Sequence, residues 1–507
     1  MKNLRTLLGA AISTFALAAT AAPDEPAWPT REWPVSSPEA QGMDSAALAK
    51  LVDFGAAGEM DSLLVTRHGR IVLEATYAPF KPGMKHTLNS ATKSVVGTLV
   101  AMAVDKGLLE GTQQRVVDLF ADRKIEQLDD RKKAVTIQSL LDMTSGIDWT
   151  EPLGGAPETI LEMTRSREWQ QFVLDRPMAE TPGRSFNYNS GNPHLLSAIL
   201  SRKTGRSTQA FAEQELFKPL GISDIAWRRD PQGVSLGGWG LYLQPRDMAK
   251  IGYLYLRGGM WEGQRLVPPA WIEEVMQARI DMRLGGGSSV LYANSWWVVP
   301  ARHAYMAVGF KGQVIAVLPE LDIVAVTTGR KGEGLGAFLA QLADAVKANG
   351  PLPANPGAEA LIAQRISEAA TEKLSAVPPA PALATSVSGK TYRFGRNPLG
   401  VESFRLDLAG PQPAYDMVVA TPRLPTPTQR WTGPIGMDGR FAVNVQGGGV
   451  NAVKGTWVAA DTLAVVWRYV LDGSASSYTL KFDGNHVAVT VEDAFGNKFD
   501  LQGMASD

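Results

Sequence analysis

Ser90 and Lys93 form the one Ser-x-x-Lys arrangement of this chain, directly before an apolar stretch, residues 95–109, that is predicted to be helical. Residues three apart on a helix face the same way, so the Lys93 amine is expected within hydrogen-bond reach of the Ser90 hydroxyl. A neutral lysine in that place can act as a base and make a serine nucleophilic without any histidine. Because the pattern is short, about one match is expected by chance in a chain of this length. The surrounding segments therefore decide what it means.

Tyr188 is the best candidate for a third chemical group. It lies in a polar segment, residues 182–192, which leads into a helix predicted from Leu195. A phenol there can exchange protons with Lys93, while Ser190 can hydrogen-bond the amine or a substrate. The alternative is a loop tyrosine that only packs against its neighbours.

A third segment, residues 308–314, reads as a glycine-broken turn between two strands. Its backbone can line a site, and the NH of Gln313 can be offered to an oxyanion. The alternative is an ordinary tight hairpin. Trp149 and Trp239 are candidates for an apolar rim that contacts an acyl chain, although either can equally be a core residue.

The elements that must position these residues follow from periodicity and turn signals. A helix is predicted over residues 43–57 with Asp44 as its cap, followed by a hairpin around His68 and Gly69. The middle, residues 136–280, is mainly helical. Strands are predicted again at residues 295–299, 305–308, 314–318 and 323–328. A helix at residues 334–347 ends the domain. This order of sheet, helices and sheet predicts an α+β domain. Both ends of the domain contribute strands to one mixed sheet, helices flank that sheet, and the middle of the chain forms a helical subdomain.

A change of composition marks a second domain. Pro-rich segments bracket a polar helical stretch, and short strands with hairpin signals follow, at Asp438-Gly439, Asp472-Gly473, Asp483-Gly484 and Gly496-Asn497. A small all-β domain, either a sandwich or a lipocalin-like barrel, is predicted. The predicted organisation is a signal peptide at residues 1–21, a catalytic domain at 35–350, a linker with a helical stretch at 351–387 and the β-rich domain at 388–507.

Composition limits the class of protein. The 507 residues are 45% hydrophobic and 20% charged, with a net charge of -1, so two domains are expected and nucleic acid is not an expected partner. The absence of cysteine excludes disulfides, a thiolate nucleophile and cysteine-ligated metals.

The N-terminus resembles a secretory signal. Lys2 and Arg5 precede an apolar run, residues 7–19, which ends at Ala19-Thr20-Ala21 before a Pro-rich segment. The run is short for a membrane span, so an uncleaved anchor and a disordered tail are the weaker alternatives. We expect a periplasmic or secreted protein, with no stable membrane insertion once the signal is removed.

In their order along the chain and in their residue types, five segments resemble the serine β-lactamase superfamily. The resemblance is to the branch that holds class C β-lactamases, related esterases and 6-aminohexanoate-dimer hydrolases. They are residues 90–94, 140–149, 186–191, 237–247 and 309–313. The resemblance covers roughly residues 35–350 and implies a β-lactamase-like fold. It also implies that Ser90 is the acylated nucleophile, that Lys93 and Tyr188 transfer protons, and that the NH groups of Ser90 and Gln313 form the oxyanion hole.

Two departures from the family pattern bear on the substrate. Where β-lactamases show Tyr-x-Asn, this chain has Tyr188-Asn189-Ser190, the variant familiar from 6-aminohexanoate-dimer hydrolases. Where they carry Lys-Thr-Gly, which grips a substrate carboxylate, the aligned triplet is Phe310-Lys311-Gly312. Since a shift of one residue reverses the face that a strand side chain serves, Lys311 is expected to point to solvent unless it bends into the pocket. Gly312 and Lys311 thus remain candidate substrate-binding residues.

Rival sites have less support. The run of residues 233–237 matches Gly-x-Ser-x-Gly, but it lacks the preceding buried strand and following helix that a nucleophile elbow needs. The five histidines are far apart without metal-binding spacing, and neither His86 nor His194, the two near the motifs, is needed for the mechanism.

The sequence therefore predicts a secreted serine hydrolase that needs no cofactor or metal and cleaves a small ester or linear amide of the 6-aminohexanoate-oligomer type. The alternatives are a class C β-lactamase, a D-Ala-D-Ala peptidase, a penicillin-binding-like sensor in which Ser90 acylates without turnover, and a binding protein whose β-rich domain does the main work.

Overall fold

The computed structural model describes residues 28–151, 158–278, 280–282, 290–332, 334–421 and 428–506. The predicted signal peptide, residues 1–21, lies outside these ranges. Within them, no helix has the length and apolar character that crossing a membrane requires.

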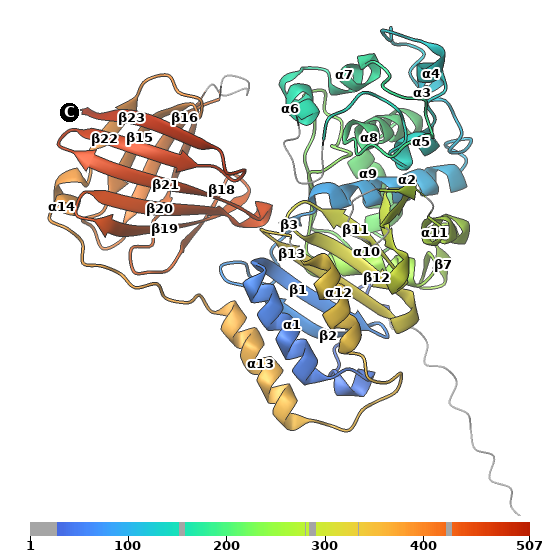
Figure 1. Cartoon of the computed structure of the whole chain (residues 1–507), viewed down its shortest axis with the longest axis horizontal. Coiled ribbons are helices and arrows are strands. Elements are labelled where there is room, and N and C mark those ends of the chain that lie inside the picture. Colours follow the sequence, from blue (N-terminus) through green and yellow to red (C-terminus); the bar gives the residue numbers. More distant parts are fainter. Residues whose placement is uncertain are drawn as a thin grey trace, which may run out of the picture.

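An eight-stranded sheet forms the centre of the N-terminal domain, in the order β2-β1-β13-β12-β11-β10-β9-β8 (Figure 1). The strands are β1 (Met60–Arg67), β2 (Arg70–Thr76), β8 (Ile280–Asp281), β9 (Leu291–Ala293), β10 (Trp296–Val299), β11 (Ala304–Gly309), β12 (Gln313–Leu318) and β13 (Ile323–Gly329). Both ends of the domain contribute, as predicted, because β1 pairs with β13. The pairs in the described part of this sheet are antiparallel rather than mixed, since short turns join successive strands such as β11, β12 and β13.

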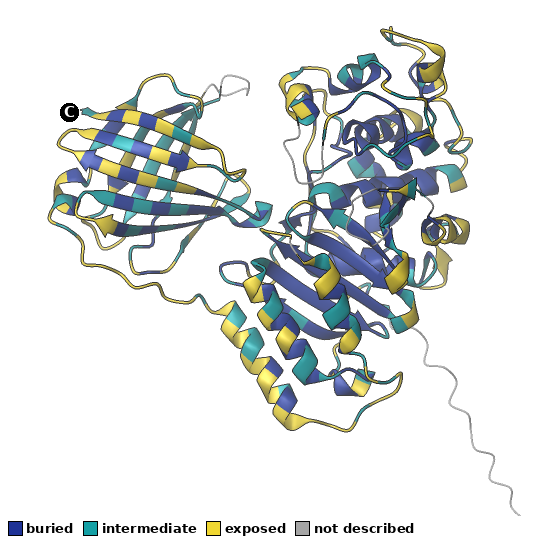
Figure 2. Ribbon diagram, viewed as in Figure 1, coloured by how far each residue is buried: buried dark blue, intermediate teal, exposed yellow. Residues whose placement is uncertain are grey.

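Side chains alternate between two cores, one on each face of this sheet. On β12, Ile315 and Val317 join the core beneath α2 (Thr92–Asp105), α8 (Gly191–Thr204) and α10 (Pro245–Leu256). Val314 and Ala316 face the other core, under α1 (Ser45–Ala57), α12 (Leu335–Asp344) and α13 (Pro356–Ala370). Because both faces are covered, the strands are buried along nearly their whole length, as the dark blue sheet in Figure 2 shows.

A helical subdomain lies above α2 in the view of Figure 1. Besides α8, it contains α3 (Val116–Leu119), α4 (Asp130–Lys133), α5 (Ile137–Leu141), α6 (Glu158–Arg165), α7 (Trp169–Asp175), α9 (Thr208–Ala212) and a π-helix at Glu213–Phe217. The chain returns to the sheet through α10, α11 (Pro269–Met276) and a small sheet of β3 (His86–Thr87), β5 (Leu241–Leu243) and β4 (Ala226–Trp227). A two-stranded ribbon of β6 (Met260–Trp261) and β7 (Gln264–Arg265) lies between α10 and α11.

The segment predicted as a linker contains two helices. α13 packs its Ile362 and Ile366 onto the core beneath α1, so this part of the segment belongs structurally to the N-terminal domain. α14 (Leu383–Val387) instead buries Ala384 and Val387 against the C-terminal domain. The extended stretch between them joins the two domains.

Ten antiparallel strands form the C-terminal domain, in the order β17-β16-β15-β14-β23-β22-β21-β20-β19-β18. They are β14 (Thr391–Phe394), β15 (Val401–Asp407), β16 (Ala414–Ala420), β17 (Thr428–Pro434), β18 (Ala442–Gln446), β19 (Gly449–Ala459), β20 (Thr462–Tyr469), β21 (Ser474–Asp483), β22 (His486–Glu492) and β23 (Lys498–Ser506). Buried and exposed residues alternate along several strands (Figure 2), because alternate side chains face the interior.

The two edge strands almost close this sheet into a barrel. Side chains of β18 bridge to the backbone of β17: Asn444 donates to the Thr432 carbonyl at 2.7 Å, and Gln446 donates to the Arg430 carbonyl at 3.0 Å. The hairpin predicted at Asp438-Gly439 is therefore wrong. That turn connects β17 and β18, the two edge strands of the sheet, which are not paired through their backbones. The other three predicted hairpins are present.

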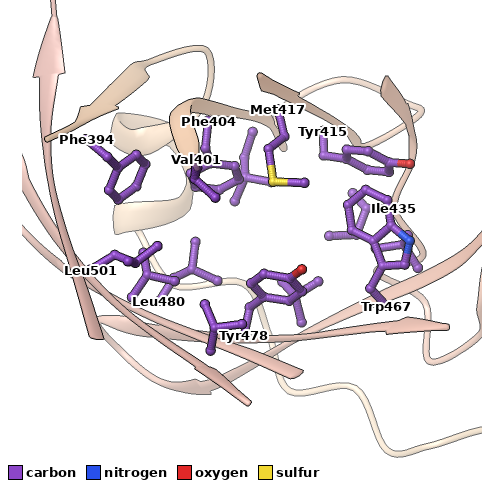
Figure 3. Close-up of a pocket in the computed structure, with 15 residues that line it drawn as sticks. Phe394, Val401, Phe404, Tyr415, Met417, Ile435, Trp467, Tyr478, Leu480 and Leu501 are labelled. Atoms are coloured by element: carbon purple, nitrogen blue, oxygen red, sulfur yellow. The ribbon is translucent and has the colours of Figure 1, made fainter. Parts of the chain in front are cut away.

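The barrel interior holds an apolar cavity of about 50 Å³. Figure 3 shows Phe404, Met417, Tyr478 and Leu480 among the side chains around it.

Candidate active site

Ser90 lies in a single 3-10 turn, η2 (Asn89–Ala91), immediately before α2. Lys93 is in the first turn of α2, and its Nζ donates to Ser90 Oγ at 2.8 Å, as the spacing predicted. The same ammonium group donates to the Gly238 carbonyl at 2.8 Å. Lys93 is 1% exposed, whereas Ser90 is half-buried and reachable from outside.

The surroundings of Lys93 favour its neutral form. Burial removes water from the ammonium group and lowers the pKa of Lys93 to about 8, while the nearby Glu151 carboxylate acts in the opposite direction. A lysine with this pKa is partly neutral near pH 7–8 and can accept a proton from the serine to which it is bonded.

Tyr188 faces Lys93 and Ser90. The Lys93 ammonium lies 4.8 Å from the centre of the Tyr188 ring, and the phenol hydrogen-bonds with Ser90. Burial and the Glu151 charge raise the pKa of Tyr188 well above its usual range, and the Ser90 bond only partly offsets them. Tyr188 is therefore a neutral phenol at physiological pH, able to donate a proton.

The loop of residues 140–149 fixes the Tyr188 segment. Asn187 N donates to the Met143 carbonyl at 2.8 Å, and Ser145 Oγ donates to Asn192 Oδ1 at 3.0 Å. Asn189 Oδ1 accepts from the NH of Gly191 at 2.8 Å, which secures the start of α8. This network explains why the two family-like segments occur together.

Glu151 is a site residue that sequence reasoning missed. Its carboxylate accepts hydrogen bonds from Ser190 N at 2.8 Å, Ser190 Oγ at 2.7 Å and Trp149 Nε1 at 2.7 Å. The Ser190 hydroxyl therefore donates its hydrogen bond to Glu151 and not to the Lys93 amine, which was one of its two predicted partners. The only hint in the sequence was a carboxylate two residues beyond the Trp149 motif, and no spacing rule selects it.

The two tryptophans differ. Trp149 is buried and packs edge-to-face on Phe172 with ring centres 6.4 Å apart, and its contact with a substrate stays a prediction. Its indole NH donates to Glu151, and its ring belongs to the core on the α2 side of the sheet. Trp239 is partly buried beside Trp169, at 5.7 Å between ring centres.

The β11–β12 turn lies against the nucleophile turn. At Gly309, the last residue of β11, a Cβ atom would lie 2.1 Å from the Leu88 carbonyl oxygen, so only glycine permits this approach to η2. The buried Gln313 side chain braces the turn: it donates to the Phe310 carbonyl at 3.0 Å and the Gly329 carbonyl at 2.8 Å, and it accepts from Gly329 N at 3.1 Å. This bracing was not predicted. Gly312, between them, offers its carbonyl to Thr327 at 2.8 Å.

Lys311 does not point to solvent, which corrects the sequence-based expectation. It is half-buried, and its Nζ donates to the carbonyl of Ala494 in the C-terminal barrel at 3.1 Å. The positive φ of 64° at Lys311 departs from extended strand conformation, so the alternation of faces does not apply to this residue. The ammonium group that could have gripped a substrate carboxylate thus has a protein partner.

The rival sites have structural roles. Ser235 is fully buried, and its hydroxyl accepts from Gln209 N at 3.3 Å. His194 is buried against Asp230 at 3.1 Å, and His86 against Asp61 at 3.2 Å. Each of these three residues therefore has a structural partner inside the protein.

Fold and site together define a serine hydrolase with an antiparallel sheet, a helical subdomain and a Ser-Lys-Tyr cluster at their junction. Residues 46–346 match the family model described as Beta-lactamase, which is more than half of the chain. The chain belongs to the β-lactamase family of serine hydrolases.

Individual proteins are similar to this chain in sequence or in structure. The chain is 27% identical over 284 residues to the 6-aminohexanoate-dimer hydrolase of Paenarthrobacter ureafaciens, covering 52% of this chain and 71% of that protein. The structure of a putative 6-aminohexanoate-dimer hydrolase from Bacillus anthracis is 18% identical, covers 67% of this chain and 87% of the other, and has a TM-score of 0.51. EstCE1, described as a hydrolase with promiscuous acyltransferase activity, is 20% identical, with 60% and 99% coverage and a TM-score of 0.49.

Proposed function

We propose that this protein is a secreted serine hydrolase that cleaves small esters or linear amides of the 6-aminohexanoate-oligomer type through an acyl-enzyme at Ser90. One observation carries the proposal: the buried Lys93 ammonium group donates to Ser90 Oγ at 2.8 Å beside the Tyr188 phenol. A nucleophile, a base and an acid are then within reach of one another.

In the acylation step, neutral Lys93 takes the Ser90 proton while Oγ attacks the substrate carbonyl. The NH groups of Ser90 and Gln313 donate to the resulting oxyanion, and the bracing of the β11–β12 turn by the Gln313 side chain supports this role. Preorganised donors matter because they need not reorganise when the charge develops.

Collapse of the tetrahedral intermediate breaks the bond to the leaving alcohol or amine. Tyr188 gives that group a proton and regains one from protonated Lys93, so the charges balance within the cluster. Its raised pKa suits this donor role. Water then attacks the acyl-enzyme with the same groups in reverse order, which releases the acid and restores Ser90.

Two observations favour an ester or linear amide over a β-lactam antibiotic, which carries its carboxylate on the carbon bonded to the scissile amide nitrogen. Lys311, one residue after the position of the family's carboxylate-gripping lysine, bonds to Ala494 instead. The carboxylate of Glu151 lies near Lys93 and Tyr188 and disfavours a second negative charge there. The relative from Paenarthrobacter ureafaciens, a 6-aminohexanoate-dimer hydrolase, supports the linear amide.

Secretion rests on the basic and apolar N-terminus alone. Fractionation of cells that express the full chain should place activity in the periplasm or medium, with cleavage near residue 21. Recovery of the uncleaved chain in the cytoplasm would contradict secretion but would leave the proposed acyl-enzyme at Ser90 unaffected.

The function is tested with a purified-enzyme panel: a short-chain nitrophenyl ester, 6-aminohexanoate dimer, a chromogenic cephalosporin and a D-Ala-D-Ala peptide. We expect steady turnover of the ester or linear amide, weaker cephalosporin hydrolysis, and loss of activity in Ser90→Ala. A single burst of acylation without turnover would support the sensor alternative instead.

A further inference from the structure

The C-terminal barrel touches the segments that build the candidate active site through two of its turns. Resting on the proposed function, we propose that the barrel is a positioning part of this active site, and that Lys311 is the positioning residue that couples the barrel to the oxyanion turn. One contact is the β22–β23 turn, residues 493–497, and the other is the β20–β21 turn, which contains η6 (Val470–Asp472) and Gly473.

The β22–β23 turn meets the turn that precedes Gln313. Lys311 Nζ donates to the Ala494 carbonyl at 3.1 Å. That carbonyl is held in place because Asp493 Oδ1 accepts from Phe495 N at 2.8 Å and from Asn497 N at 2.9 Å. An ammonium group on a fixed carbonyl is a charge-assisted bond, which is stronger than a neutral one.

The other side of the same turn is bonded to the nucleophile segment. The Phe310 carbonyl accepts from Asn89 Nδ2 at 2.9 Å and from Gln313 Nε2 at 3.0 Å, and Asn89 precedes Ser90. The turn is therefore fixed from the barrel by Lys311 and from the hydrolase domain by Asn89 and Gln313. Loss of the barrel contact leaves the Gln313 NH supported from one side.

The β20–β21 turn contacts three more segments of the site. A Cβ at Gly473 would lie 2.4 Å from the Gly329 carbonyl oxygen and 2.9 Å from His86 Cε1, so the backbone of this turn lies directly on both. Gly329 binds the Gln313 side chain, and His86 is four residues before Ser90. Asp472 accepts from the Tyr242 hydroxyl in β5, the strand that follows the Gly238 loop.

Buried charged residues stabilise the contact between the barrel and the hydrolase domain. Arg468 of β20 is buried and donates to Asp61 Oδ1 of β1 at 2.7 Å and to the Ala78 carbonyl at 3.3 Å. Asp61 is fully buried and also bonds to His86 at 3.2 Å. Separating the domains would leave Asp61 without its closest cation, so the barrel is attached rigidly instead of merely tethered.

The barrel interior offers less support for a ligand-binding role. Its cavity of about 50 Å³ is small beside the roughly 150 Å³ in which a buried apolar site holds benzene. The contacts of its turns therefore point to positioning as its function.

The test measures kcat and KM for Lys311→Ala, Lys311→Arg and Lys331→Ala with a neutral short-chain nitrophenyl ester. We expect Lys311→Ala to lower kcat by about 10- to 100-fold with KM nearly unchanged, because a displaced oxyanion donor weakens transition-state binding. Lys311→Arg should recover most of this activity, since a guanidinium can donate to the same carbonyl. Lys331→Ala is the matched control: its ammonium pairs at 3.7 Å with Glu59 of the hydrolase domain.

A double-mutant cycle tests the route through the barrel. Asp493→Ala loosens the β22–β23 turn and should reproduce the Lys311→Ala defect, and the double variant should be little worse than either single one. Normal kcat in Lys311→Ala, or fully additive defects, would overturn the proposal. A rise in KM confined to carboxylate-bearing substrates would show instead that Lys311 binds substrate.

The rate at which a fluorophosphonate labels Ser90 separates this proposal from the proposed function. Labelling needs the nucleophile and oxyanion hole but no particular substrate. Labelling that is slowed in Lys311→Ala and absent in Ser90→Ala supports both claims, whereas equal rates in wild type and Lys311→Ala refute the positioning role alone. If Ser90→Ala is labelled as fast as wild type, the proposed function fails, and the positioning role fails with it.

Discussion

At the residue scale, Lys93 is the group whose titration should control the rate. Burial lowers its pKa to about 8, and the lysine must be neutral to accept the Ser90 proton. We expect kcat/KM to be low in acid and to rise with pH through a midpoint of about 8. Lys93→Ala should lower it by about three orders of magnitude or more. A profile that is flat between pH 6 and 9, or near-normal activity in Lys93→Ala, would refute the assignment.

Glu151 should tune that midpoint. Its charge raises the pKa of Lys93, so Glu151→Gln should move the rising limb of the kcat/KM profile to lower pH. The exposed Glu158→Gln, on α6, is the control for loss of a carboxylate and should leave the midpoint in place. An unchanged midpoint in Glu151→Gln, or a shift to higher pH, would show that this carboxylate does not act on Lys93.

The catalytic residues were predictable to different degrees. Ser90 and Lys93 are three apart at a helix start, so local geometry alone brings them together. Glu151 and the Gly238 carbonyl reach the site through tertiary contacts that no local pattern encodes. Lys311 was misplaced because its partner, Ala494, lies in another domain.

At the scale of elements, the β11–β12 turn depends on the Gln313 side chain. Gln313→Ala would leave the buried NH and carbonyl of Gly329 without their partner, which should cost about 2 kcal/mol of unfolding free energy. Urea unfolding should show this loss together with a lower kcat. Gln264→Ala, on the exposed strand β7, is expected to change stability by less than about 0.5 kcal/mol. A loss in Gln313→Ala no larger than in this control would contradict the bracing role.

Element prediction succeeded where signals are local. Asp44 caps α1 through Ala46 N at 2.8 Å, and β1 and β2 flank the predicted His68-Gly69 turn. It failed at Asp438-Gly439, since a turn motif does not reveal whether the strands it joins are neighbours or opposite edges of one sheet.

At the scale of the whole molecule, the two domains should unfold together. Arg468→Met removes the closest cation from buried Asp61 and should cost about 3 kcal/mol or more. The control Arg405→Met breaks an exposed pair with Asp407 and should cost less than about 1 kcal/mol. Calorimetry should show one transition in wild type that moves to lower temperature in Arg468→Met. Two independent transitions in wild type would contradict a rigid joint.

The central claim is that Ser90 carries the acyl group. Wild-type enzyme mixed with a short-chain nitrophenyl ester and quenched within one turnover should show, by mass spectrometry, one added acyl group on the peptide that contains Ser90. This adduct should disappear once the substrate is exhausted. Full turnover by Ser90→Ala, or an adduct on any other residue, would contradict the account.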